Sequence, residues 1–131
     1  MTLIEQVATY LQDTLSLGTI GTNIFINRLP DSPDSAIAVI DTGGAEPDRH
    51  IPVKRPTFQI LIRGTDYDAS KAILDAVRGL HNKFPGNSTT GLLTAGGTYI
   101  LSMMAISEGG SLGADDVGRD LMSINFICKT R

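Results

Sequence analysis

The first stretch of the chain places its apolar residues at helical spacing. Between residues 3 and 15 the apolar positions recur in steps of three and four, which puts them on one face of a helix. The segment Thr-Leu-Ile-Glu at 2–5 has the form of a capping box, with Thr2 as the cap and Glu5 reaching back. The pattern therefore predicts a helix that begins at Thr2 and ends before Gly18.

Three segments in the first half of the chain have strand patterns. Residues 23–27 form a short apolar run, and residues 36–40 are apolar at every position, which is typical of a central strand covered on both faces. Residues 57–63 alternate apolar and polar side chains most clearly. We expect each of these segments to be a strand of the same sheet.

A second amphipathic pattern follows at residues 68–84. Its apolar positions form one continuous face, and its polar side includes Lys71, Asp75, Arg78 and His81. The Pro-Gly-Asn sequence at 85–87 ends the pattern. These features predict a second helix, longer than the first.

Two longer strands are predicted at the end of the chain, over residues 98–107 and 119–129. In the first of them, strict alternation puts Ile100 and Met103 on opposite faces. In the second, one face carries Met122, Ile124, Phe126 and Cys128.

The remaining segments predict two long loops within a single domain of residues 1–131. Residues 41–56 contain two glycines and three prolines, which is typical of an exposed loop. Residues 108–118 are too long and too rich in glycine for a tight hairpin. The order of helix, strands, helix, strands indicates an α+β fold, with a mainly antiparallel sheet and two helices packed on one face. Because several strands are apolar on both faces, we expect another chain to cover the other face.

The charge of the protein gives little sign of nucleic-acid binding. The chain has 131 residues and a net charge of −3, whereas nucleic-acid-binding proteins usually concentrate basic residues on one face. The one basic concentration is Arg49, His50, Lys54 and Arg55, which is either a solvated loop or a contact for an acidic partner.

The single cysteine and the N-terminus bear on where the protein is found. Cys128 leaves no internal disulfide and fits a buried apolar position. With neither a signal-peptide pattern nor an apolar run of membrane-spanning length, we expect a protein that is made in the cytoplasm and contacts no membrane.

Candidate chemistry is weak throughout. One cysteine and two histidines, His50 and His81, are too few for a closed zinc site, and Asp115 with Asp116 is more typical of a solvated loop than of a cation site. The glycine-rich segments at 93–98 and 109–113 do not lead from a strand into a helix with a lysine, so neither is a phosphate loop. We therefore predict a protein without enzyme activity or cofactor, although a serine–histidine site built on His50 or His81 stays open.

Four short motifs in a fixed order resemble a known family. Thr-Gly-Gly at 42–44 follows an apolar strand, and Pro-Thr-Phe-Gln-Ile at 56–60 leads to Arg-Gly at 63–64. A helix comes next, and the segment 118–126 matches the pattern Gly-Arg-x-x-x-Ser-x-Asn-Phe. This order resembles the bacteriophage minor capsid protein family that includes the tail terminator and tail completion proteins of long-tailed phages.

The resemblance implies a structural part of the virion tail. Such proteins are small α+β subunits that form a ring, commonly a hexamer, which ends the tail tube and joins it to the head. The implied partners are further copies of the chain, the tail tube protein and the head–tail connector protein, with DNA passing through the lumen without specific binding. The residues that we expect at contacts between subunits are Gly43, Gly44, Arg55, Gln59, Arg63 and Arg119.

The physical grounds for these positions leave an alternative open. Gly43 and Gly44 permit backbone conformations closed to other residues, and Arg63 and Arg119 have the planar head group that suits paired contacts across a subunit boundary. Ordinary turn glycines and strand-end charges would have the same sequence. Other hypotheses are a head-completion protein, a tail tube subunit or, less favoured, a small enzyme or ligand-binding module.

Overall fold

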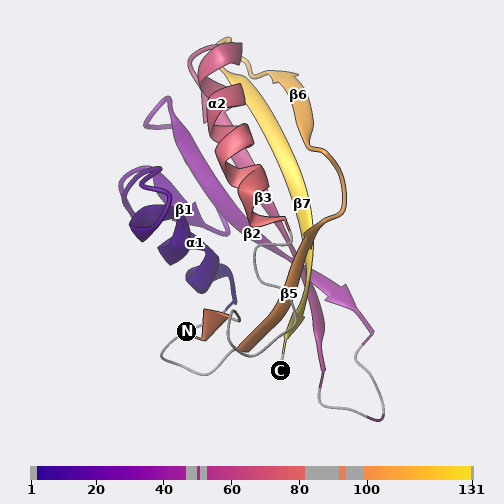
Figure 1. Ribbon diagram of the computed structural model, residues 1–131. Helices are drawn as coiled ribbons and strands as arrows, with labels where there is room; N and C mark the ends of the chain where they lie inside the picture. Colours follow the sequence, from indigo (N-terminus) through magenta and orange to yellow (C-terminus); the bar gives the residue numbers. More distant parts are fainter. Residues whose placement is uncertain (1–2, 47–49, 51–52, 82–91, 94–98, 131) are drawn as a thin grey trace.

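The computed structural model describes residues 3–46, 50, 53–81, 92–93 and 99–130. The strands form one seven-stranded sheet in the order β1-β2-β3-β7-β5-β4, and β6 pairs with β7 off this path (Figure 1). The elements are, in chain order, α1 (Leu3–Asp13), β1 (Ile24–Ile26), β2 (Ala36–Ala45), β3 (Arg55–Gly64), α2 (Tyr67–Val77), the 3-10 turn η1 (Arg78–Leu80), β4 (Leu92–Leu93), β5 (Tyr99–Ala105), β6 (Gly110–Ala114) and β7 (Asp120–Thr130).

The sheet is mainly antiparallel, as the sequence predicts. Only β1 and β2 pair in parallel, while β2 with β3, β3 with β7, and β7 with β5 and β6 are antiparallel. Both helices pack against one face of this sheet, α1 beside β1 and β2 and α2 beside β3 and β7 (Figure 1). The predicted α+β fold is therefore confirmed.

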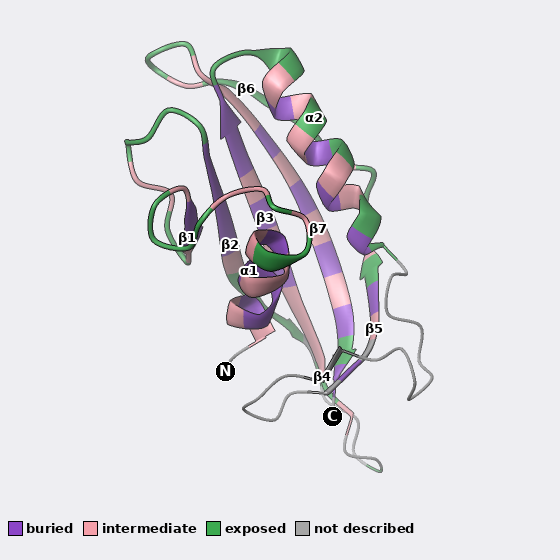
Figure 2. Ribbon diagram, turned by 60° about the vertical axis from the view of Figure 1, so that its left-hand side comes forward, coloured by how far each residue is buried: buried purple, intermediate pink, exposed green. Residues whose placement is uncertain are grey.

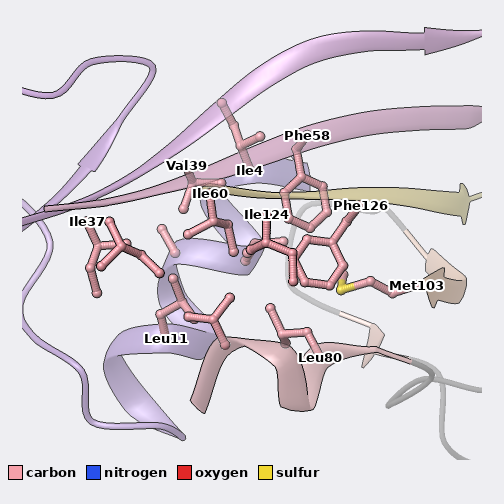
Figure 3. Packing of buried hydrophobic residues seen from close by; sticks show 14 of the residues in the cluster. Ile4, Leu11, Ile37, Val39, Phe58, Ile60, Leu80, Met103, Ile124 and Phe126 are labelled. Atoms are coloured by element: carbon pink, nitrogen blue, oxygen red, sulfur yellow. The ribbon is translucent and has the colours of Figure 1, made fainter. Parts of the chain in front are cut away.

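The hydrophobic core lies between the two helices and this face of the sheet. Val7 and Leu11 of α1 and Leu74 of α2 are fully buried against strand residues. At the centre the rings of Phe58 and Phe126 stack with their centroids 5.1 Å apart (Figure 3). Aromatic pairs in this arrangement add to the stability that area burial provides.

Period-two patterning decides which face of each long strand is buried. Along β7, Met122, Ile124 and Phe126 are buried, and the residues between them are only partly buried, so the two classes alternate (Figure 2). In β3, Phe58, Ile60 and Ile62 behave in the same way. The other face of the sheet therefore stays partly exposed to solvent.

Both predicted loops are shorter than the sequence indicates. Strand β2 continues through Gly43 and Gly44 to Ala45, and β3 already begins at Arg55, so the prediction of a loop over 41–56 is wrong at both ends. A bulge between Asp41 and Gly43 absorbs the glycines into the ladder. The prediction of a loop over 108–118 is also wrong in part, because residues 110–114 form β6.

Two element predictions also need correction. Ile100 and Met103 are both buried rather than on opposite faces, because a register shift between Ile100 and Ser102 resets the alternation of β5. The α-helical part of the second helix ends at Val77 and tightens into η1, well before residue 84. The predicted cap Thr2 and the helix-ending segment 85–87 lie outside the described residues.

Candidate functional site

Five of the six residues that the sequence singled out fall into two groups at opposite ends of the sheet, and the sixth lies between them. Gly43, Gly44 and Arg55 lie where β2 and β3 approach their shared loop, with Ala45 opposite Arg55 in the ladder. Arg63 lies at the other end, opposite Ala36, and Arg119 immediately precedes β7 there. Gln59 lies between them, opposite Ile40 and Asn125. The fold brings no single cluster together from these residues within one chain.

Arg119 is the centre of an ion cluster at one end of the sheet. Its Nε donates to Asp115 Oδ2 at 2.7 Å, and its Nη1 lies 3.3 Å from Asp34 Oδ1 and also donates to the carbonyl of Asp31. The side chain is only 12% exposed. Arg119 therefore ties the turn between β6 and β7 to the loop that precedes β2.

Arg63 holds the same loop from inside the sheet. It is buried, its Nη2 donates to Pro33 O at 2.6 Å, and its Nε donates to Asp34 O at 3.2 Å. Burial, and then the positive charge of Arg119, lowers the pKa of Arg63 from its ordinary value. Both arginines thus have structural partners within their own chain, a role that the sequence analysis did not assign to them.

Asp115 is held in its ionised form by this cluster. Burial alone would raise its pKa, but hydrogen bonds from the backbone and guanidinium of Arg119 and from the Val117 amide outweigh that effect, so the pKa lies below its usual value. For Arg119, burial alone would lower the pKa, and the partnership with Asp115 raises it above its ordinary value. The pair is therefore charged at every pH near neutrality.

The two glycines at the other end have geometric reasons to be glycine. Gly43 has φ +93° and donates its amide to Asp41 Oδ1 at 2.8 Å, which closes the bulge in β2. Gly44 has φ +149°, and a Cβ atom there would collide with the carbonyl oxygen of Arg55. A side chain at either position requires strained backbone, and at Gly44 it also forces β2 and β3 apart.

A groove of about 260 Å³ opens beside these glycines. It lies between the first turn of α1, the end of β1 and the β2–β3 ladder. Its lining is about equally polar and apolar. The polar members are Glu5, Asn27, Asp41 and Thr57, and the apolar and glycine positions are Leu3, Ile4, Ile26, Gly43 and Pro56. We call it the α1–β2 groove. The sequence alone gives no signal for it, because its walls come from four separated segments.

The segment from β6 to β7 exposes apolar side chains at the opposite edge of the sheet. All five residues of β6 are exposed, and Leu112 among them is 59% exposed. Val117, in the turn that follows, is 72% exposed. Residues 110–118 are called the β6 tip below. Leu112 and Val117 therefore each present an apolar side chain to solvent from this segment.

A separate pocket of about 360 Å³ lies near His81, Arg78, Ser107 and Glu108. His81 is exposed, but its Nδ1 accepts a hydrogen bond from the Ala105 amide at 2.9 Å, and Ser107 Oγ accepts one from the Gly109 amide. Among the described residues, no hydrogen bond joins Ser107 to His81, and a nucleophilic serine needs such a base. The pocket therefore gives little support to the serine–histidine hypothesis.

Other chemistry is also weak in the part of the chain that the structure describes. Within those residues, no group of three or more histidine, cysteine, aspartate or glutamate side chains is placed to hold a metal ion. Burial raises the pKa of the Cys128 thiol to about 12, which keeps it protonated and unreactive. No helix in the described residues is long and apolar enough to span a membrane.

Taken together, these features define a small α+β protein with an ion cluster at one end of its sheet and a groove toward the other. A family model described as bacteriophage tail terminator protein matches residues 10–131, and the chain therefore belongs to that family. The resemblance seen in the motif order is confirmed. A comparison with curated proteins found no match. Membership makes the chain a structural component of the phage tail and favours a role without catalysis.

Proposed function

We propose that this protein is the subunit of a closed ring that ends the tail tube and docks it to the head. Six copies form the ring, each copy contacts the tail tube protein on one side and the head–tail connector protein on the other, and DNA passes through the lumen without specific binding. The single observation that carries this proposal is membership of the tail terminator family over residues 10–131.

Features of the fold support a protein that assembles. All five residues of β6 are exposed, and the face of the sheet away from the helices is only partly buried, with Met104 48% exposed. Gly43, Gly44, Arg55 and Gln59 stay in this proposal as contact positions, and Arg63 and Arg119 enter it as residues that hold the neighbouring loops in place.

Two measurements test the proposal: the mass of the species that the protein forms in solution, and its effect on the elongation of tail tubes. Light scattering or native mass spectrometry of the purified protein across a range of concentrations should give one closed species of six chains. Added to growing tail tubes, the protein should stop their elongation. A chain that stays monomeric at every concentration and leaves tube growth unchanged would contradict the proposal.

A tail tube subunit or a head-completion protein is the alternative within virion parts. A tube subunit should polymerise without limit, because its contacts repeat along an axis, whereas a terminator should stop at the closed ring. A head-completion protein should bind isolated heads and leave tube growth unchanged.

A further inference from the structure

The charged residues of the chain are sorted between the two ends of the sheet. One end, which we call the acidic end, carries two arginines, Arg63 and Arg119, and seven aspartates. The aspartates are Asp31, Asp34, Asp66, Asp68, Asp115, Asp116 and Asp120. The opposite end, which we call the basic end after the cations at its strand ends, carries Lys54, Arg55 and Lys129; the described carboxylates toward it are Glu5, Asp41 and Glu46. Negative charge is thus concentrated at the acidic end, whereas the described cations and carboxylates balance at the other end.

Apolar features accompany the charges at each end. The β6 tip lies at the acidic end, since Ala114 is paired with Asp120, and it presents Leu112 and Val117 to solvent. The α1–β2 groove lies toward the basic end, where Pro56 directly follows Arg55. A groove of about 260 Å³ is large enough to receive an aliphatic side chain. One end therefore offers projecting apolar groups, and the other offers a recess for them.

These two surfaces are unlike each other and complementary, and they belong to the same chain. A contact between unlike surfaces of identical subunits is heterologous, and it closes into a ring when the rotation between neighbours permits. We propose that the β6 tip of one copy inserts Leu112 into the α1–β2 groove of the next copy, with Asp116 placed over Lys54 and Arg55. This contact rests on the proposed ring and names the surfaces that form it.

The carboxylates in the groove restrict how the tip enters. Glu5 and Asp41 line the groove, and Asp41 already accepts the Gly43 amide. Bringing Asp116 close to them would cost energy through like-charge repulsion. The tip therefore enters with its apolar side chain in the groove and its carboxylate outside, over the basic residues at the rim.

A charge exchange tests this contact directly. Asp116→Lys alone and Lys54→Glu alone should each weaken self-association about tenfold or more, because each places like charges together at every interface. The double variant, with both changes in one chain, should return to within about threefold of the wild type, because each interface regains an opposite pair. The measurement is the concentration at which half of the chains are assembled, at low ionic strength.

Matched controls carry the same changes of charge elsewhere. Asp13→Lys and Lys71→Glu alter the net charge by the same amounts at helix positions outside the β6 tip and outside the groove lining, and they should leave assembly unchanged. Leu112→Asp should abolish assembly, while Leu112→Met should preserve it. Thermal unfolding of each variant checks that the subunit stays folded, since the four charged positions and Leu112 lie on the surface.

The outcomes separate this inference from the proposed function. Assembly of the wild type into a ring, with Asp116→Lys, Lys54→Glu and Leu112→Asp no different from the controls, overturns the contact and leaves the ring standing. A failure of the double variant to recover overturns the pairing of Asp116 with Lys54. A wild type that never assembles and never caps tail tubes overturns both.

Discussion

The Arg119 guanidinium binds carboxylates and a carbonyl from two loops that are far apart in the chain. Asp31 and Asp34 precede β2, while Asp115 follows β6, and all three meet at one side chain that is 12% exposed. Arg63 supports the same loop through two carbonyls. Because the β6 tip is anchored at Asp115, these internal bonds also fix the position of the surface that we propose for subunit contact.

At the scale of single residues, the first prediction concerns Asp115→Asn. The pKa of Asp115 in the folded protein lies below its unfolded value of about 3.8, so its stabilisation is present above that value and is lost as the pH falls through the folded pKa. The wild type should therefore be more stable than Asp115→Asn at pH 6, and the difference should shrink toward pH 2. Urea unfolding at several pH values measures it.

The control for that experiment is Asp68→Asn, an exposed aspartate in the first turn of α2. Its stability difference from the wild type should vary less with pH in the same range. A difference for Asp115→Asn that stays constant from pH 6 to pH 2 would contradict the role of the ionised carboxylate.

Sequence reasoning singled out Arg63 and Arg119 but not their partners within the chain. Arg63 and Arg119 stand out as charges at strand ends, yet a single sequence does not show that both reach the loop at 31–34, about 30 and 88 positions away along the chain. The contact depends on how the sheet aligns β2, β3 and β7. For Gly43 and Gly44, by contrast, the conformational reason given from the sequence agrees with their positive φ values.

At the scale of elements, the β2–β3 ladder depends on Gly44. Gly44→Ala should lower the free energy of unfolding by on the order of 1–3 kcal/mol, because the backbone has φ +149° and the new methyl group meets the Arg55 carbonyl. Gly79→Ala is the matched control, since its Cβ would meet nothing within 4 Å; it should change stability by less than about 0.5 kcal/mol. Chemical denaturation measures both, and equal effects would contradict the steric argument.

The start of α2 provides the next prediction. Asp66 caps the helix by accepting the Ala69 amide at 2.8 Å. Asp66→Ala should therefore cost about 0.5–2 kcal/mol of stability, whereas Asp66→Asn keeps an acceptor and should cost much less. Thermal unfolding measures the stability of the two variants. If Asp66→Asn lost as much stability as Asp66→Ala, the charge of Asp66 rather than its capping hydrogen bond would be responsible.

Periodicity predicted the elements better than their ends. The alternation runs through β7 and from Phe58 to Ile62 in β3, so the buried faces over these residues were predicted correctly. Bulges defeat this reasoning, because one extra residue shifts the alternation without any change in composition. That is why strict alternation puts Ile100 of β5 on the wrong face, and why the glycines of β2 wrongly predict a loop.

At the scale of the whole molecule, the order of motifs identified the family while individual motifs identified no chemistry. Four short segments spread over most of the chain agree with the family match over residues 10–131. The separation of acidic from basic residues needed the fold, because Asp31, Asp68 and Asp115 come from three different parts of the sequence. The groove likewise exists only once α1 lies beside the β2–β3 ladder.

A heterologous interface makes a further prediction about mixtures of defective chains. Leu112→Asp disables the apolar contact of the β6 tip but leaves the α1–β2 groove intact. Lys54→Glu combined with Arg55→Glu impairs the groove side of the contact but leaves the β6 tip intact. Each variant alone should be monomeric. An equimolar mixture should form dimers and nothing larger, because only one intact tip can meet one intact groove, and the dimer presents no further working pair.

The size of the mixed species distinguishes the two kinds of symmetry. In a twofold contact between identical tips, the groove-defective chain would dimerise by itself and the tip-defective chain would take no part. Native mass spectrometry resolves these cases when one variant carries a mass label, because the heterologous contact gives a dimer with one labelled and one unlabelled chain. Rings in the mixture, or dimers of one variant alone, would contradict a tip-to-groove contact. If the mixed dimer is the final species, each subunit must have two unlike contact surfaces. A row of subunits joined through two unlike surfaces is able to close into a ring.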